Sequence, residues 1–150
     1  MRFNTLFFTA LAGFITTAVA QAGFCPEAAR FGNIAVSPST LAPGQTMTIT
    51  TNLTCAVELG DTPTFLDYYV DGSSEHNIGG PVLIARRTYD ASTSPPLDTF
   101  TTTLPVWFYI QDATYSARVD NSFARPGPTG ESVIEVGAIS TAINITGLTQ

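Results

Sequence analysis

Apolar and polar residues alternate along the stretch from Met47 to Cys55. Met47, Ile49 and Leu53 occupy odd positions, whereas threonine and asparagine fill the even positions. Successive side chains of a β-strand point to opposite faces, so the pattern predicts a strand with one apolar and one hydroxyl-rich face. An apolar face of this kind requires a partner sheet.

Short segments with the same alternation recur along the chain, separated by turns rich in Pro, Gly and Asp. We expect further strands over residues 33–36, 64–70, 82–85, 100–104, 112–119 and 133–146. Within the segment 64–70, Leu66, Tyr68 and Val70 share a face. No segment has the periodicity of a convincing amphipathic helix.

The segment 112–119 has the most diagnostic spacing. It reads D-A-x-Y-x-A from Asp112 to Ala117, with Tyr115 at its centre. This spacing resembles the tyrosine corner of immunoglobulin-like sandwiches, where a tyrosine hydroxyl bonds backbone groups at a crossing between sheets. Together with about seven strands it predicts an all-β fold, an immunoglobulin-like Greek-key β-sandwich, as one domain over residues 21–150.

The first twenty residues predict a signal peptide over residues 1–20. The apolar stretch from Leu6 to Ala20 ends in Ala18-Val19-Ala20, a small-x-small cleavage pattern. We expect cleavage before Gln21, with a cut after Ala22 as the alternative. An uncleaved anchor is disfavoured because the stretch is shorter than the ~20 residues that a membrane span needs. The product is expected to be secreted and extracellular, in the host apoplast or a host cell if it acts on a host.

The charge of the chain limits the classes of partner that it is expected to bind. Charged residues make up 12% of the chain, below the ~25% of ordinary soluble domains, and the formal net charge is −6. Phosphate backbones and anionic lipids repel such a chain, so we expect neither nucleic acid nor membrane partners. We also expect the protein to be a monomer. All the basic residues are arginines. The absence of lysine reflects either composition or escape from lysine-directed modification inside a host cell.

Two kinds of covalent modification are predicted. Cys25 and Cys55 are the only cysteines, and export through an oxidising compartment is expected to join them in a disulfide. The triplets beginning at Asn52 and Asn144 are N-glycosylation acceptors, and alternation places both asparagines on outward faces.

Catalytic and metal-binding patterns are weak in this sequence. His76 is the only histidine and is expected to be a solvated loop residue. Asp67 and Asp71 share a strand face and could act as a carboxylate pair, but strand-edge acids that deter pairing are the preferred interpretation. Arg86-Arg87 is interpreted as a strand end rather than a processing site. We therefore expect no enzyme, no metal and no cofactor.

Aromatic residues supply the candidate binding positions. The run from Pro105 to Ile110 reads P-V-W-F-Y-I and packs into a core by default. A run this apolar near a connection between sheets could instead be partly exposed and act as a binding hot spot, with Trp107 as the candidate residue. Tyr69 is the second candidate. Together with Tyr68, these two rings could also stack on sugars.

Several short motifs carry a resemblance to a known group of proteins. They are I-x-x-S-P-S-T-x-x-P-G at 34–44, G-G-P-V-L-I at 79–84, T-T-T-L-P at 101–105 and the closing strand through 143–145. The chain resembles small secreted proteins of filamentous fungi and, loosely, the necrosis-inducing secreted protein family of fungal effectors. The resemblance implies an effector that interferes with plant immune signalling by binding receptor-associated kinases. No binding residue can be carried over from that family.

The leading functional hypothesis is a secreted, non-enzymatic, protein-binding module, a fungal effector at a host interface. The alternative is a cell-wall or carbohydrate-binding module. An enzyme that uses Asp67 and Asp71 ranks behind both.

Overall fold

The computed structural model describes residues 25–73 and 80–148. The elements are η1, a 3-10 helix (Glu27–Ala29), β1 (Asn33–Ser37), β2 (Thr40–Leu41), β3 (Thr46–Asn52), α1 (Thr54–Glu58), β4 (Phe65–Gly72), β5 (Val82–Thr88), β6 (Leu97–Thr103), β7 (Tyr115–Pro126) and β8 (Ser132–Ile145). The predicted signal peptide and His76 lie outside the described residues.

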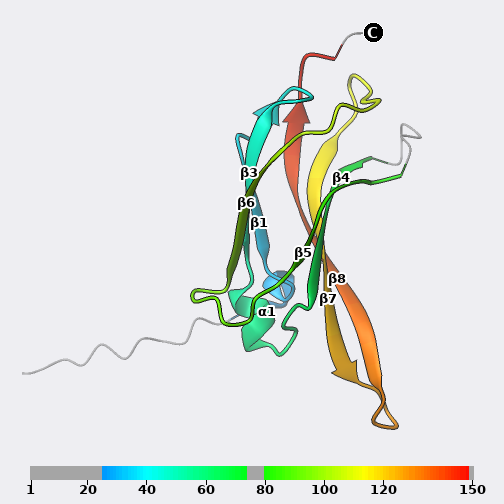
Figure 1. The fold of residues 1–150 in the computed structure, drawn as a ribbon. Helices are drawn as coiled ribbons and strands as arrows, with labels where there is room; N and C mark the ends of the chain where they lie inside the picture. Colours follow the sequence, from blue (N-terminus) through cyan, green and yellow to red (C-terminus); the bar gives the residue numbers. More distant parts are fainter. Residues whose placement is uncertain (1–24, 74–79, 149–150) are drawn as a thin grey trace, which may run out of the picture.

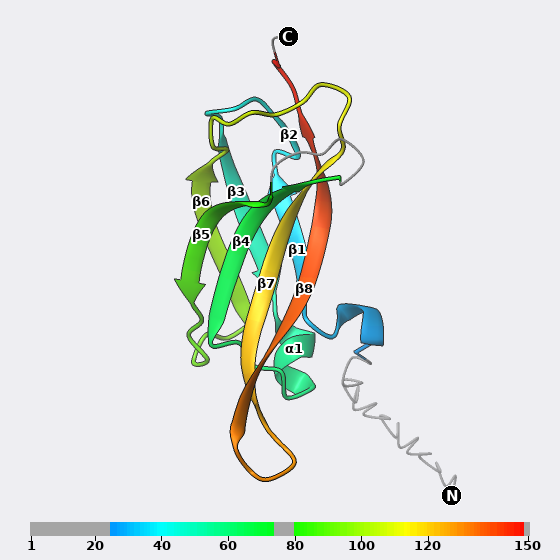
Figure 2. The ribbon, with the colours of Figure 1, turned by 90° about the vertical axis from the view of Figure 1, so that its right-hand side faces the viewer.

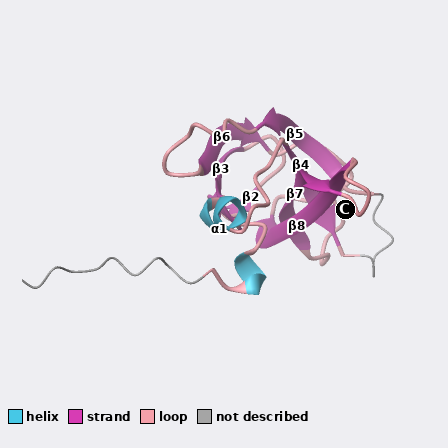
Figure 3. Ribbon diagram, turned by 90° about the horizontal axis from the view of Figure 1, so that it is seen from below, coloured by secondary structure: helices cyan, strands magenta, loops and turns pink. Residues whose placement is uncertain are grey.

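The strands form two sheets that face each other. One has the order β1-β3-β6 and the other the order β2-β8-β7-β4-β5. Figures 1 and 2 show the two layers, and the end-on view in Figure 3 separates β3 and β6 from β5, β4, β7 and β8. The predicted all-β sandwich is thus confirmed, whereas the immunoglobulin-like Greek-key connectivity stays a prediction.

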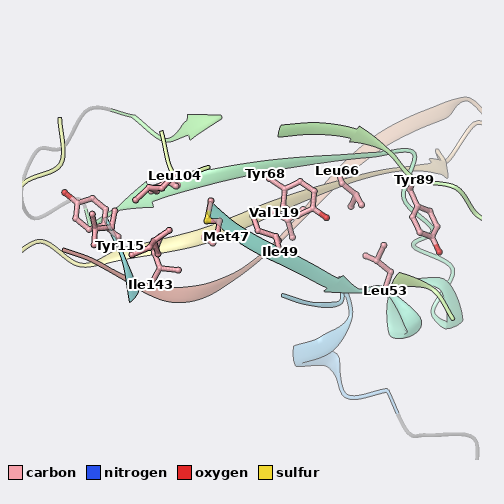
Figure 4. Close-up of a cluster of buried hydrophobic side chains, with 14 of the residues drawn as sticks. Met47, Ile49, Leu53, Leu66, Tyr68, Tyr89, Leu104, Tyr115, Val119 and Ile143 are labelled. Carbon is pink, nitrogen blue, oxygen red and sulfur yellow. The ribbon is translucent and has the colours of Figure 1, made fainter. Parts of the chain in front are cut away.

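The core lies between the sheets and takes the faces that the alternation predicted. Met47 and Ile49 of β3 are buried, as are Leu66, Tyr68 and Val70 of β4. Figure 4 shows side chains from both layers meeting in this interior. Burial of a large apolar side chain contributes roughly 1.5–3 kcal/mol, so this shared interior is the main stabilising feature of the fold.

A buried hydrogen-bond network also joins the two sheets. Tyr68 of β4 donates to Thr51 Oγ1 of β3 at 2.9 Å or to Asp98 Oδ2 of β6 at 2.8 Å. Arg87 of β5 donates to the same carboxylate, with its Nε at 2.8 Å from Asp98 Oδ2. Burial raises the pKa of Tyr68 well above its usual value, so the hydroxyl stays protonated and keeps its donor.

The strand predicted to reach Cys55 ends earlier, which is a correction. β3 stops at Asn52, and Cys55 lies in the short helix α1. The side-chain Oδ1 of Asn52 accepts the backbone N–H of Thr54 at 3.0 Å, an Asx turn that redirects the chain. Leu53 is fully buried despite this change, so the odd-even pattern continued beyond the strand and concealed its end.

The predicted disulfide between Cys25 and Cys55 is confirmed, with a Cα–Cα distance of 5.4 Å. It ties the start of the described chain to α1. Nearby, Asp61 is fully buried and accepts hydrogen bonds from Arg30 and Arg125. These bonds fasten the N-terminal segment and β7 to the same end of the sandwich.

The β7–β8 hairpin is longer than expected. The segment predicted over 112–119 runs on to Pro126 and pairs with β8 without a break, from Tyr115↔Ile143 to Pro126↔Ser132. Figures 1 and 2 show this hairpin projecting beyond the rest of the sandwich, at the end opposite the C-terminus. We call its distal part, residues 123–136, the arm. Across the described part of the chain, no helix has the length and apolar character needed to cross a membrane.

Candidate functional site

The candidate site is the connection between β6 and β7, residues 104–114. Four large apolar side chains project from it into solvent, with exposed fractions of 80% for Val106, 52% for Trp107, 82% for Phe108 and 40% for Ile110. We call these four residues the apolar loop. Clustered apolar exposure of this kind is typical of interaction surfaces, which makes this connection the candidate site.

Buried anchors hold both ends of the connection. At its start, Leu104 is fully buried, its N–H donates to the Gln45 carbonyl at 2.9 Å, and its own carbonyl accepts from Gly44 at 2.8 Å. At its end, the Tyr115 hydroxyl accepts the Ile110 N–H at 2.6 Å and lies 3.2 Å from the Ile110 carbonyl. These bonds confirm the tyrosine-to-backbone contact predicted from the D-A-x-Y-x-A spacing.

Aromatic contacts organise the middle of the connection between β6 and β7. Tyr109 turns inward and packs edge-on against Tyr115, with ring centroids 5.4 Å apart. Burial raises the pKa of Tyr109 to about 12, so its hydroxyl is neutral at physiological pH. Trp107 and Phe108 make an edge-to-face pair at 5.4 Å on the solvent side. The backbone N–H of Tyr109 donates to the Trp107 carbonyl at 2.9 Å, which links the inward ring to the outward pair.

Two grooves border this end of the molecule. One has a volume of about 360 Å³ and is lined by Ala42, Pro43, Val106, Trp107, Phe108, Tyr109, Gly147 and Leu148. The other, of about 330 Å³, is lined by Ile110, Gln111, Asp112, Ala113 and residues 144–148. The two grooves share Gly147 and Leu148, so the apolar loop stands beside continuous concave surface, a shape suited to a partner that contributes protruding side chains.

The two sequon asparagines lie at different ends of the sandwich. Both side chains are exposed, as the alternation predicted. Asn144 lines the groove beside Asp112, whereas Asn52 lies next to Cys55 and α1. Their glycosylation stays a prediction, and a glycan on Asn144 would border the apolar loop.

Tyr69, the second predicted binding residue, lies apart from Trp107. It is on the outer face of β4, where the Arg118 guanidinium sits 5.1 Å from its ring centroid. Trp107 instead lies beside Val70 and Val82, on the inner side of the same sheet. The structure therefore does not bring the two candidates together, and Arg118 already occupies one face of the Tyr69 ring.

The interpretation of Asp67 and Asp71 as strand-edge acids is wrong. β4 is an interior strand between β7 and β5. Asp67 binds Arg86 through two bonds of 2.6 and 2.7 Å, and Asp71 binds Arg118 at 2.7 Å. The hydrogen bond from Arg86 lowers the pKa of Asp67, so this carboxyl stays ionised and is unsuited to donate a proton in glycoside hydrolysis.

The structure also bears on the sequence interpretations of Tyr68 and of Arg86-Arg87. Tyr68 is fully buried, which removes it as a sugar-stacking platform. Arg86 and Arg87 lie in the last three residues of β5, in agreement with the predicted strand end. Arg86 pairs with Asp67 of the same sheet, whereas Arg87 pairs with Asp98 of β6 in the opposite sheet. In residues 25–73 and 80–148, no three His, Cys, Asp or Glu side chains gather in a way that could hold a metal ion.

Partial exposure of the run from Pro105 to Ile110 was inferred from the sequence, but only Trp107 within it was named as a binding residue. Val106 and Phe108 are more exposed than the tryptophan itself. Pro105, the first residue of the run, was the available signal, since proline interrupts a strand ladder and favours a loop.

Comparison of the chain with protein-family models, with curated proteins and with solved structures finds no match. The likeness to fungal effectors therefore remains an expectation carried by short sequence motifs. Any functional conclusion depends on the geometry of the apolar loop.

Proposed function

We propose that the protein is a secreted, non-enzymatic module that binds a protein partner through the apolar loop. The observation that carries the proposal is the exposure of Val106, Trp107, Phe108 and Ile110 on a connection anchored at both ends. Trp is the residue type most enriched among binding hot spots, and grooves flank it here. The disulfide suits an extracellular location.

The partner class follows from the sequence resemblance. A fungal effector that interferes with host immune signalling would bind a host protein, and a receptor-associated kinase is the partner which that family implies. An acidic, lysine-free chain fits this role by avoiding nonspecific attachment to nucleic acids and anionic membranes.

The test is capture of host proteins on the immobilised protein, followed by titration of the recovered partner. Trp107→Ala is expected to weaken binding by more than ~10-fold, because a hot-spot truncation costs about 2 kcal/mol or more. Leu83→Ala is the matched control, since Leu83 of β5 is 49% exposed against 52% for Trp107. Equal affinity of the Trp107 variant and the wild type, or no specific partner, would count against the proposal.

One observation favours the alternative of a cell-wall or carbohydrate-binding module, namely the half-exposed Trp107 ring. The other two predicted platforms are compromised, because Tyr68 is buried and Arg118 covers Tyr69. Retention on chitin or glucan that is lost in Trp107→Ala would support this alternative. Induction of the transcript only during host contact would support the effector.

A further inference from the structure

In the part of the chain that the structure describes, the outer edge of β8 has no strand paired to it over most of its length, although β1 lies close to β8 and the Phe31 ring packs against Gly137. Among the described residues, β8 pairs on that side only with β2, at Asn144 and Ile145. Its pairing with β7 on the other side is continuous. An open strand edge presents a row of backbone N–H and C=O groups that can template another strand.

The bonds at the β2 end show which β8 residues face the open edge. The N–H of Asn144 donates outward to the Ser39 carbonyl at 2.8 Å. Alternate residues of a strand direct their backbone groups to the same side, and β8 pairs with β7 without a register shift. Ile134, Val136 and Ala138 therefore direct their N–H and C=O groups to the open edge.

The same residues place apolar side chains on the outer face of the sheet. Ile134 and Val136 are each 61% exposed. The register aligns Phe65, Ser122 and Val136 in one row across β4, β7 and β8, and Phe65 is 45% exposed. Exposed apolar side chains, interrupted by Ser122, thus extend across this face to the unpaired edge.

The opposite edge of this sheet, formed by β5, has features that block pairing with another strand, and the edge of β8 has fewer of them. The edge strand β5 follows Pro81, carries Arg86 and Arg87, and has a register shift in its pairing with β4. Charges, prolines and bulges are the usual means of blocking edge-to-edge association. The edge of β8 from 132 to 140 carries one charge, Glu135, whose carboxylate lies 3.2 Å from Arg125 Nε.

We propose that a second copy of this chain adds its β8 to this edge, in antiparallel pairing around a two-fold axis at Val136. In that register Ile134 meets Ala138 and Glu135 meets Gly137, so no like charges face each other. A two-fold axis at Glu135 would set two carboxylates opposite each other, which is unfavourable. Antiparallel pairing of identical edges is isologous and closes after two copies, so the two five-stranded sheets join into one.

The interface is small and the dimer is accordingly weak. A ladder from Ser132 to Ser140 is about 30 Å long at ~3.4 Å per residue. With the flanking apolar side chains it covers on the order of 500 Å² per copy, below the ~800 Å² of a standard interface. We therefore expect weak, micromolar self-association, whereas the sequence alone predicted a monomer.

The position of the arm gives the dimer a consequence for binding. The arm and the apolar loop lie at opposite ends of the sandwich (Figure 1), so pairing of the arms leaves both apolar loops free. The dimer would then present two copies of any site on the loop, and bivalent attachment raises apparent affinity without new contacts. The self-association itself does not depend on the proposed function.

Sedimentation equilibrium tests the proposal on the purified protein. The expected mass rises from one chain at ~1 µM to nearly two chains at ~200 µM. Val136→Lys is expected to weaken association by at least ~10-fold, because it places two like charges at the two-fold axis. Leu83→Lys, the same change on the protected edge, is expected to dimerise like the wild type. A monomer at every concentration, or equal effects of the two variants, would overturn the proposal.

Amide hydrogen exchange gives a second readout that needs no variant. The N–H groups of Ile134, Val136 and Ala138 are expected to exchange quickly in dilute protein and to become protected at ~200 µM. Those of Val133 and Glu135 point toward β7 and are expected to be protected at both concentrations. Fast exchange at the edge amides in a sample shown to be dimeric would exclude this interface.

Discussion

Removal of the Tyr68 hydroxyl is expected to destabilise the sandwich more than its size suggests. The side chain is fully buried, and its hydroxyl lies 2.9 Å from Thr51 Oγ1 and 2.8 Å from Asp98 Oδ2. A hydrogen bond to a charged group contributes about 1.5–3 kcal/mol and one to a neutral group about 1 kcal/mol. Asp98 keeps its bond to Arg87, so the two losses do not add fully. We expect Tyr68→Phe to lower the free energy of unfolding by about 2–3 kcal/mol.

Chemical denaturation followed by circular dichroism measures this change. For a domain of this size it corresponds to a fall in Tm of roughly 10 °C. Tyr69→Phe is the matched control, because it is the same substitution one residue later on the outer face. We expect the control to change stability by less than about 0.5 kcal/mol. If Tyr68→Phe were as stable as the control, the hydroxyl would not be a link between the sheets.

Three further outcomes follow from the structure. Arg86 lowers the pKa of Asp67 in the folded protein, so the stability that this carboxylate contributes is present above about pH 4 and is lost as the pH falls below that value. Asp67→Asn is therefore expected to flatten the acid limb of a curve of Tm against pH, and an unchanged limb would contradict the ion pair. Phe108→Ser is expected to leave Tm within about 2 °C of the wild type because the ring is 82% exposed, and a large fall would show that the ring is packed. Reduction of the Cys25–Cys55 disulfide is expected to lower the free energy of unfolding by roughly 3–4 kcal/mol in urea titrations with and without reductant, whereas equal midpoints would mean that the cross-link does not constrain the unfolded chain.

Local patterns predicted the parts of the fold that depend on local geometry. The alternation around Met47 and Ile49 is enough to predict a strand and its buried face, because side-chain direction in a strand is set by the backbone. The disulfide required only that two cysteines pass through an oxidising compartment. The bonding of Tyr115 followed from a spacing that places its hydroxyl near preceding backbone groups.

Long-range pairing was beyond the same patterns. Whether Asp67 lies on an edge or an interior strand depends on which segments flank β4, and its partner Arg86 comes from a strand that follows a separate loop. The end of β3 was missed because Leu53 stays buried after the chain leaves the strand. Helical and extended segments can bury the same odd-numbered residue, so alternation alone cannot locate such an end.

The exposure of the apolar loop also depends on distant residues. The run from Pro105 to Ile110 has the composition of a core strand. It faces solvent because Leu104 is held by Gln45 and because Tyr109 takes the inward position against Tyr115. A single sequence carries no direct record of these contacts, so it allowed both a buried and a partly exposed run and named only Trp107 as a binding residue.

Trp107 allows a direct test of binding through the apolar loop, because it is the only tryptophan in the chain. Incorporation of 5-fluorotryptophan places one ¹⁹F label on the apolar loop, and its resonance can be followed while the captured partner is added. Burial of the ring in a complex is expected to shift that resonance and to remove its solvent-isotope effect. An unshifted resonance that keeps its full solvent-isotope effect, at a saturating concentration of the partner, would contradict the account.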